Sequence, residues 1–272
     1  MPDIFIFFSA FLIGLCFGSF ANVVIYRLPK GLSISKPPSA CPSCKKQLQA
    51  IDLVPVLSWF FLRGKCRRCK KKISVRYPLV ELLCGMLFAS MAYASMVNGS
   101  PTLSLVPLSV FVFVLLVVSF IDADTQEIPD GLLIIGAVAG IIFIACGHFM
   151  SEIFPHARDW KDALLGVIAG AAPLLIIDRL CLLIVKKDGF GYGDVKLMAM
   201  VGLFLGWQNV LMAFLFAFVS GAVFAVYLMV TGKAKRGSYF AFGPFLCIGT
   251  YLAFFFGKAV LDWYVAFITM PV

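Results

Sequence analysis

The chain has 272 residues, of which 61% are hydrophobic and only 14% charged, and its formal net charge is +9. Soluble domains carry about a quarter charged residues and about half apolar ones, so this composition excludes an ordinary soluble protein. Apolar runs of roughly 20 residues, enough to cross a ~30 Å hydrocarbon core, recur along almost the whole chain. The sequence therefore predicts an all-α polytopic membrane protein.

The first apolar run, residues 4–26, has no basic residue before it and no A-x-A cleavage site behind it. We therefore expect a retained first helix rather than a signal peptide. Further spans are predicted at 78–97, 104–122, 132–150, 163–185, 195–206, 208–231 and 240–268. The segment 195–206 is short, and we expect it to be tilted or partly irregular, which is tolerated at membrane depth only beside protein or a wet cavity. About eight transmembrane helices result.

The hydrophilic stretch 29–76 holds twelve basic residues and a single acid, Asp52. Basic residues close to membrane segments mark the cytoplasmic side, so the N-terminus is predicted outside and this stretch inside. With eight crossings, most basic residues of the later links also fall inside, namely Lys186, Lys187, Lys233, Lys235 and Arg236. Topology and attraction to membrane lipids explain the positive charge, and we expect no nucleic-acid partner.

Two C-x-x-C pairs lie within this stretch, Cys41 with Cys44 and Cys66 with Cys69. Four thiolates in two such pairs are typical of a closed tetrahedral zinc site, which would fold a loop with little core of its own. A redox pair is the alternative, but stable disulfides are rare in the cytoplasm. We predict a structural Zn²⁺ domain at 29–76, between a first transmembrane helix at 1–28 and a polytopic domain at 77–272.

Acidic residues near membrane helices are costly and mark candidate functional sites. Asp122 and Asp124 end one apolar run, Asp130 precedes the next, and Asp194 follows Gly191-Tyr-Gly193. The crossing count places all four at the cytoplasmic boundary. Two carboxylates that meet there would share a proton, as in an aspartic protease. Helix capping is the alternative for Asp130 and Asp194, and a solvated or supporting acid is the alternative for Asp124.

The other cysteines lie in apolar runs, and we expect them to be small hydrophobic side chains: Cys16, Cys84, Cys146, Cys181 and Cys247. His148 and His156 fall on the predicted outer side, and no role is assigned to them.

Six motifs occur in order along nearly the whole chain. They are Gly18-Ser-Phe-Ala-Asn-Val-Val-Ile-Tyr-Arg-Leu-Pro29, the paired cysteines, Arg76-Tyr-Pro-Leu-Val-Glu-Leu82, Ile121-Asp-Ala-Asp124 with Ile128-Pro-Asp130, Gly191-Tyr-Gly-Asp-Val-Lys-Leu197 and Phe242-Gly-Pro-Phe245. With these motifs the sequence resembles the type IV prepilin peptidase family, the leader peptidase/N-methyltransferases of pilus and type II secretion systems.

This resemblance implies that Asp122 and Asp194 are a catalytic pair in a GxGD-type intramembrane aspartyl protease. It implies a prepilin or pseudopilin substrate, bound through its basic leader and apolar helix and cut after a glycine on the cytoplasmic face of the bacterial inner membrane. It also implies N-methylation of the new N-terminus by S-adenosylmethionine, since all four cysteines are present. No motif by itself marks a methyl-donor site.

Three alternatives stay open. Within the enzyme class, the chain could be a peptidase without methyltransferase activity. A proton-coupled transporter would use the membrane carboxylates as a relay, although the halves of the chain show no convincing repeat. A non-catalytic assembly or zinc-dependent scaffold protein would tolerate loss of both aspartates.

Overall fold

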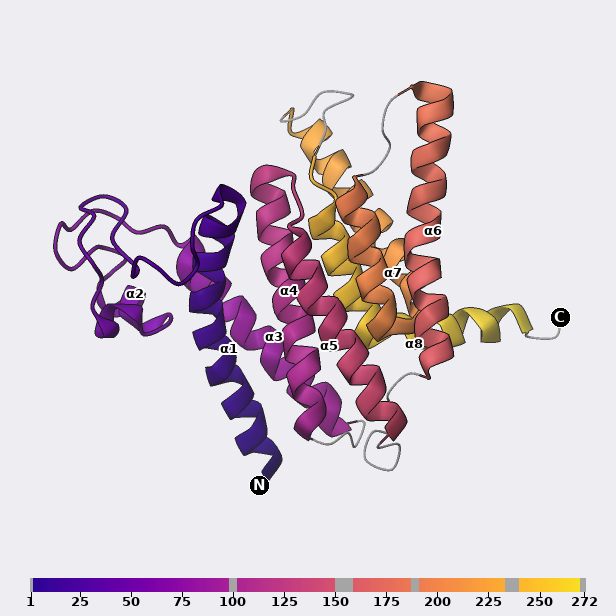
Figure 1. Ribbon diagram of the computed structural model, residues 1–272, viewed down its shortest axis with the longest axis horizontal. Helices are drawn as coiled ribbons and strands as arrows, with labels where there is room; N and C mark the ends of the chain where they lie inside the picture. Colours follow the sequence, from indigo (N-terminus) through magenta and orange to yellow (C-terminus); the bar gives the residue numbers. More distant parts are fainter. Residues whose placement is uncertain (1, 98–101, 150–158, 187–190, 233–239, 270–272) are drawn as a thin grey trace. The chain divides into compact units, whose positions relative to one another are not determined.

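The structure is a computed structural model that describes residues 2–97, 102–149, 159–186, 191–232 and 240–269. Over these residues the chain is helical, with two isolated β-bridges and no strand, as predicted (Figure 1). The α-helices are α1 (Pro2–Arg27), α2 (Leu57–Phe61), α3 (Arg76–Val97), α4 (Leu105–Thr125), α5 (Asp130–Phe149), α6 (Trp160–Val185), α7 (Tyr192–Val230) and α8 (Gly243–Thr269). His156 and the side chains of Cys146 and His148 lie outside the described residues.

Six of these helices are long and apolar enough to cross a membrane: α1, α3, α4, α6, α7 and α8. The apolar part of α5, Asp130–Ala145, is shorter. Side chains that a soluble protein would bury are exposed on these helices, for example Leu183 and Ile184 on α6. Exposure of this kind is expected where lipid is the solvent. The chain is thus a multi-pass membrane protein, as its composition predicts.

The predicted segments 195–206 and 208–231 both lie in α7, which contains one non-helical residue, Gly206. Gly206 has φ 68° and ψ 174°, a conformation that only glycine adopts readily. Before this residue α7 packs against α6, where Gly166 lies against Gly202. After it α7 packs against α8, where Gly249 lies against Ala213. The two predicted segments therefore have different neighbours.

Contacts with α8 show that α7 reverses direction at Gly206. Gly257, deep in α8, lies against Asn209, whereas Gly221 lies against Phe242, just before α8 begins. The next residue, Gly243, hydrogen-bonds to Asp122, and Asp122 interacts with Asp194 in the first turn of α7. The part of α7 after Gly206 therefore runs antiparallel to α8 and back toward the end where α7 begins.

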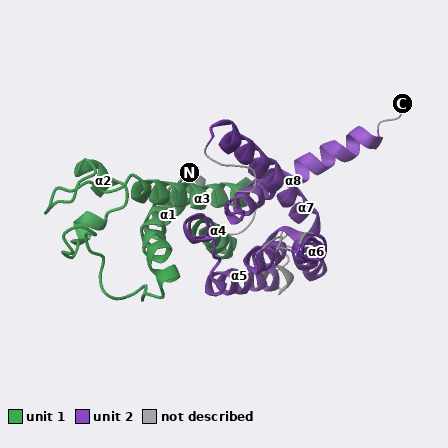
Figure 2. Ribbon diagram, turned by 90° about the horizontal axis from the view of Figure 1, so that it is seen from above, with its two compact units in different colours: residues 1–117 green, residues 118–272 purple. Residues whose placement is uncertain are grey.

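The described residues form two compact units, residues 1–117 and residues 118–272 (Figure 2). In the first unit, α1 and α3 pack closely because Gly14 and Gly18 of α1 lie against the backbone of α3. The ring of Phe17 contacts Phe88 at a centroid distance of 5.6 Å and Phe113 at 5.8 Å. The predicted domain boundaries at 28/29 and 76/77 stay predictions.

In the second unit, α5 and α6 pack against the part of α7 that precedes Gly206. Gly136 and Gly140 of α5 lie against Met200 and Leu203, and Gly170 of α6 lies against the backbone of Met198. Glycines four residues apart share one helix face, so both neighbours approach α7 closely. This packing sets the position of the first turn of α7.

Candidate active site and metal centre

Asp122 lies in the last turn of α4 and is only 6% exposed. Its Oδ2 accepts a hydrogen bond of 2.9 Å from the backbone N–H of Gly243, the first residue of α8. The N-terminal end of a helix presents free N–H groups and a partial positive charge, which favour a carboxylate. A side chain at position 243 would not fit, because its Cβ would lie 2.6 Å from Oδ2.

Asp194 is the third residue of α7, which begins at Tyr192 after Gly191 as N-cap. The backbone N–H of Gly191 donates to the Asp194 side chain. A carboxylate at this position reaches back over the first turn, as in a capping box. The capping interpretation therefore describes part of what Asp194 does, although the helix begins before Val195. The side chain is partly exposed.

The carboxyl groups of Asp122 and Asp194 interact electrostatically, although they are 72 positions apart in the sequence. Both aspartates also interact electrostatically with the thiol of Cys247, which is buried one turn into α8. Each aspartate accepts one backbone hydrogen bond from a glycine, Gly243 for Asp122 and Gly191 for Asp194. Such a pair can hold one proton between its members, activate water and polarise a carbonyl group.

Three neighbours hold the first turn of α7 in place. Arg179 of α6 donates a 2.9 Å hydrogen bond to the Tyr192 hydroxyl. Lys196 contacts both carboxylate oxygens of Asp130, the first residue of α5, at 2.8 and 2.9 Å. Gly193 lies against Ile128, and a Cβ at Gly193 would come within 2.9 Å of that side chain. Asp194 therefore projects from a turn that is fixed on several sides.

The other two acids of the predicted cluster are exposed. Asp130 is the first residue of α5, and its side chain pairs with Lys196, so its role as a helix cap stays a prediction. Asp124 lies in the last turn of α4, two residues beyond Asp122. The structure thus buries Asp122, leaves Asp194 half-buried within electrostatic reach of it, and leaves Asp124 and Asp130 at the surface.

Three further acids within the helices were not singled out as candidates from the sequence. Asp178 of α6 is 6% exposed, and Asp162 lies directly against Gly206 at the reversal of α7. Glu81 of α3 accepts hydrogen bonds from the Val56 N–H, at 2.7 Å, and from Ser19. Asp178 could have been found from the sequence, because it is an acidic residue inside the apolar run 163–185.

The four predicted metal ligands come together in the first unit. The sulfur atoms of Cys41, Cys44, Cys66 and Cys69 all lie within 4.8 Å of one another. The two pairs sit in matching turns, because the N–H of Cys41 donates to the Lys46 carbonyl and that of Cys66 to the Lys71 carbonyl. An isolated antiparallel bridge closes each turn, Ala40 with Gln47 and Lys65 with Lys72.

The sulfur geometry fits a tetrahedral metal ion. All four thiols are free, and the Sγ atoms of Cys41 and Cys69 are 3.9 Å apart. Zinc with Zn–S bonds of ~2.3 Å separates its sulfur ligands by roughly 3.8 Å. The backbone N–H of Cys44 lowers the pKa of the Cys41 thiol. The Lys71 N–H also lowers the pKa of Cys69, but burial and the neighbouring thiols outweigh it and raise that pKa to about 11. The cluster could hold a metal ion.

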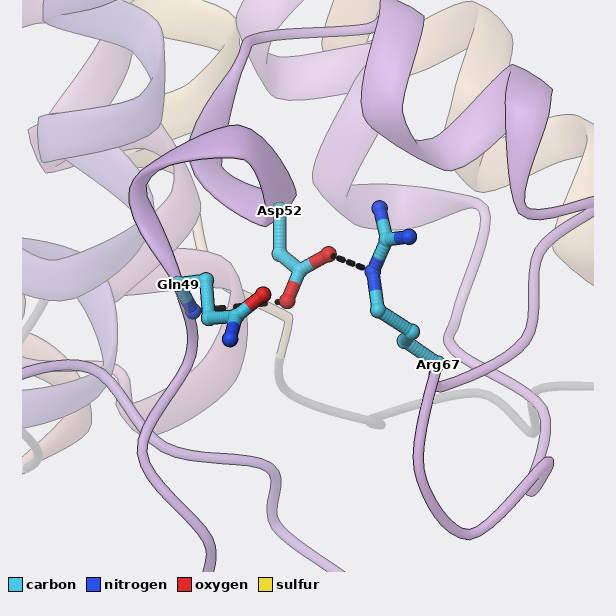
Figure 3. A network of polar contacts seen from close by, with 3 residues as sticks. All are labelled: Gln49, Asp52 and Arg67. Atoms are coloured by element: carbon cyan, nitrogen blue, oxygen red, sulfur yellow. Dashed lines mark hydrogen bonds and ion pairs between the residues drawn. The ribbon is translucent and has the colours of Figure 1, made fainter.

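Asp52, the single acid of residues 29–76, links the segment between the two cysteine turns to the second of these turns (Figure 3). Its Oδ1 accepts a 2.7 Å hydrogen bond from Arg67, which lies between the second pair of cysteines. Its Oδ2 accepts a bond of 3.3 Å from the N–H of Gln49, where a short 3-10 turn (Ala50–Leu53) begins. The ion pair therefore fixes the connecting segment against the second cysteine turn.

Among the remaining cysteines, Cys84 and Cys247 are buried, Cys181 is half-buried and Cys16 is exposed on α1. All four are free thiols in helices. Their positions agree with the expected role of small apolar side chains.

Comparison with known proteins gives consistent matches. The model of the bacterial peptidase A24 N-terminal domain matches residues 12–95, and that of the type IV leader peptidase family matches residues 109–226. A prepilin leader peptidase/N-methyltransferase of Stutzerimonas stutzeri is 35% identical over 95% of this chain and 93% of its own length. A protein of the same name from Myxococcus xanthus is 40% identical over 82% of this chain and 64% of its own length. Another from Bacillus subtilis is 32% identical over 94% of this chain and 96% of its own length. No solved structure matches the chain significantly.

Proposed function

Because the chain belongs to the type IV leader peptidase family, we propose that it cleaves the leader of a type IV prepilin or a type II secretion pseudopilin. The cleaved bond follows a glycine, and the new N-terminal residue is then N-methylated. The observation that supports this most directly is the meeting of Asp122 and Asp194. Two carboxyl groups from separate helix ends, one buried and one half-buried, interact with each other, and each accepts a hydrogen bond from a backbone N–H group.

In the proposed mechanism Asp122 and Asp194 share one proton. The ionised carboxylate takes a proton from water while the protonated carboxyl group donates a hydrogen bond to the scissile carbonyl oxygen. Water oxygen bonds to the carbonyl carbon and forms a tetrahedral diol. A proton then passes to the amide nitrogen, the C–N bond breaks, and the leader leaves with a free carboxyl group. No covalent enzyme intermediate forms.

The cysteine cluster has a structural role in this proposal. Cys41, Cys44, Cys66 and Cys69 would hold a Zn²⁺ ion, which cross-links two turns that have little core of their own. S-adenosylmethionine supplies the methyl group when it is bound. The described residues do not single out its site, so methylation rests on the family.

The charge distribution supports a cytoplasmic position for both sites in a bacterial inner membrane. The basic stretch 29–76 follows α1 directly. Counting crossings from that stretch puts the end of α4 and the start of α7 on the same side as the stretch itself. The substrate's basic leader would then lie in the cytoplasm while its apolar helix lies in the membrane.

The test is prepilin processing in membranes that contain this protein or its Asp122→Asn and Asp194→Asn variants. Each substitution should slow cleavage by at least about 10²-fold, since it removes one member of an acid–base pair. The exposed Asp124→Asn is the matched control and should retain processing. Processing that survives both substitutions would exclude the aspartate pair as the catalytic centre.

Mass spectrometry of the product separates the two activities. A mature N-terminus heavier by one CH₂ group indicates cleavage and methylation. An unmodified N-terminus indicates a peptidase without methyltransferase activity.

A further inference from the structure

The short helix α2 (Leu57–Phe61) exposes apolar side chains on one face and carries the half-buried Trp59 on the other. Leu57, Phe60 and Phe61 are 54%, 70% and 77% exposed. These three positions follow the i, i+3, i+4 spacing and so share one side of the helix. Trp59 points the other way, where its ring lies against Gly64 and its Nε1 donates to the Ile73 carbonyl at 3.2 Å. Leu57, Phe60 and Phe61 are called the α2 apolar face below.

The residues before α2 enlarge this surface. Ile51, Leu53 and Val54 are 61%, 41% and 40% exposed. Six exposed apolar side chains thus fall within eleven residues, whereas scattered single ones are usual, and in a soluble protein a patch of such side chains marks an interaction surface. The segment 51–61 therefore presents an apolar surface although it belongs to the most hydrophilic stretch of the chain.

A hydrogen bond holds this segment beside a membrane helix. The backbone N–H of Val56 donates to Glu81 Oε2 at 2.7 Å. Glu81 lies five residues after the first residue of α3, or about 7.5 Å along the helix. Leu79, in the same part of α3, is 57% exposed. The start of α2 is thus held beside a helix that is long and apolar enough to cross the membrane, and the loops lie beside α1 in both views (Figures 1 and 2).

Positive charge lies next to the apolar segment. The turn that follows α2 exposes seven basic side chains: Arg63, Lys65, Arg67, Arg68, Lys70, Lys71 and Lys72. Asp52 is the only acid between residues 29 and 76, and it pairs with Arg67. An apolar surface beside a dense basic one is the arrangement of segments that lie in the interface of an anionic bilayer.

We propose that the α2 apolar face inserts into the headgroup and upper acyl region of the membrane that α1 and α3 cross, with the basic turn 63–72 on anionic headgroups. The cysteine-bearing region then lies on the bilayer rather than projecting from it. Lipid fits this face better than a protein partner because the face begins one residue after Val56, which is bonded to a membrane helix, and because the basic turn that follows it matches anionic headgroups. The inference is independent of the proposed peptidase activity.

The test uses the full-length protein in vesicles of phosphatidylethanolamine and phosphatidylglycerol, without substrate. The photoreactive residue p-benzoylphenylalanine replaces Phe61, or replaces the exposed Lys46 in the first cysteine turn as a control. Irradiation should attach lipid at position 61 severalfold more than at position 46, as measured by peptide mass spectrometry. Equal lipid yields at both positions, or none at 61, would overturn the proposal. Cross-links from position 61 to a second chain, or to added prepilin in place of lipid, would also overturn it.

A second variant tests the same idea without a photoprobe. Phe60→Ser with Phe61→Ser should leave the metal content of the cysteine cluster unchanged, which shows that the region is folded. Trypsin should then cut the exposed lysines of the vesicle-bound variant severalfold faster than those of the parent protein. A cleavage rate equal to that of the parent would contradict insertion of this face.

Discussion

The cysteine cluster and the aspartate pair are held in place in opposite ways. In residues 29–76 only Cys41, Gly64 and Cys66 are buried, and the sulfur ligands come from two short turns. The aspartates project from ends of α4 and α7, which packed helices hold in position. A bound metal ion would stabilise the first arrangement, as proposed above, whereas side-chain and backbone packing stabilises the second. Each site should therefore fail under a different change.

The largest expected effect is at the aspartate pair. Gly243→Ala would place a Cβ 2.6 Å from Asp122 Oδ2 and displace that carboxylate. A displacement of about 1 Å can reduce a rate by ~10²-fold, so we expect at least that loss of prepilin cleavage. Gly191→Ala is the matched control: its Cβ would lie 3.8 Å from Asp194 Oδ2, and its φ of −71° suits alanine. Equal losses in the two variants would contradict this account of the packing.

Loss of one cysteine thiol should remove the metal from the cysteine cluster and unfold the stretch 29–76. Cys66→Ala removes a buried ligand, and structural zinc contributes about 10–16 kcal/mol to the folding of small zinc domains. We expect zinc per chain to fall close to zero and the stretch 29–76 to become sensitive to protease. Metal analysis and limited proteolysis measure both, with Cys16→Ala, an exposed thiol outside the cluster, as the control.

The same variant shows how separate the two sites are. Cleavage by the Cys66→Ala protein should fall far less than in Gly243→Ala, while methylation should fall with the zinc content. A loss of cleavage as large as that of Gly243→Ala would show that the peptidase also depends on the metal.

Helix packing in the second unit gives a smaller, thermodynamic effect. A Cβ at Gly202 would collide with the backbone of Gly166, so Gly202→Ala should destabilise the protein by about 1–3 kcal/mol. Gly131→Ala has nothing within 4 Å of its Cβ and should instead stabilise α5 by about 0.5–1 kcal/mol. Thermal unfolding in detergent compares the two. Similar Tm changes would contradict the close contact between α6 and α7.

Local patterns predict the cysteine region better than the aspartate region. Spacing alone identifies Cys41, Cys44, Cys66 and Cys69, because two C-x-x-C turns can meet at one ion with few other contacts. Apolar runs likewise predict the helices, since lipid requires long apolar segments whatever their neighbours are. The short predicted segment 195–206 even locates the reversal of α7 at Gly206.

Contacts between distant segments were not predictable in this way. The sequence motif contains Gly243, but only the folded chain shows that its N–H binds Asp122 across 121 positions. Asp162 lies against Gly206 because α6 and α7 pack closely, which no periodicity indicates. The exposed face of α2 was also missed, since five residues are too few for a periodic pattern.

The smallest expected effect concerns Thr250, which lies on the α8 face that also carries Gly243 and Cys247. Its hydroxyl is buried and has no hydrogen-bond partner among the described residues. A buried unsatisfied hydroxyl costs roughly 1–3 kcal/mol, so Thr250→Val should leave Tm unchanged or raise it by a few degrees. Cleavage should be unaffected if packing alone places the aspartates. A clear fall in cleavage with an unchanged Tm would instead show that this hydroxyl binds water or substrate beside the pair. The aspartate site would then depend on a bound molecule, as we propose for the cysteine cluster.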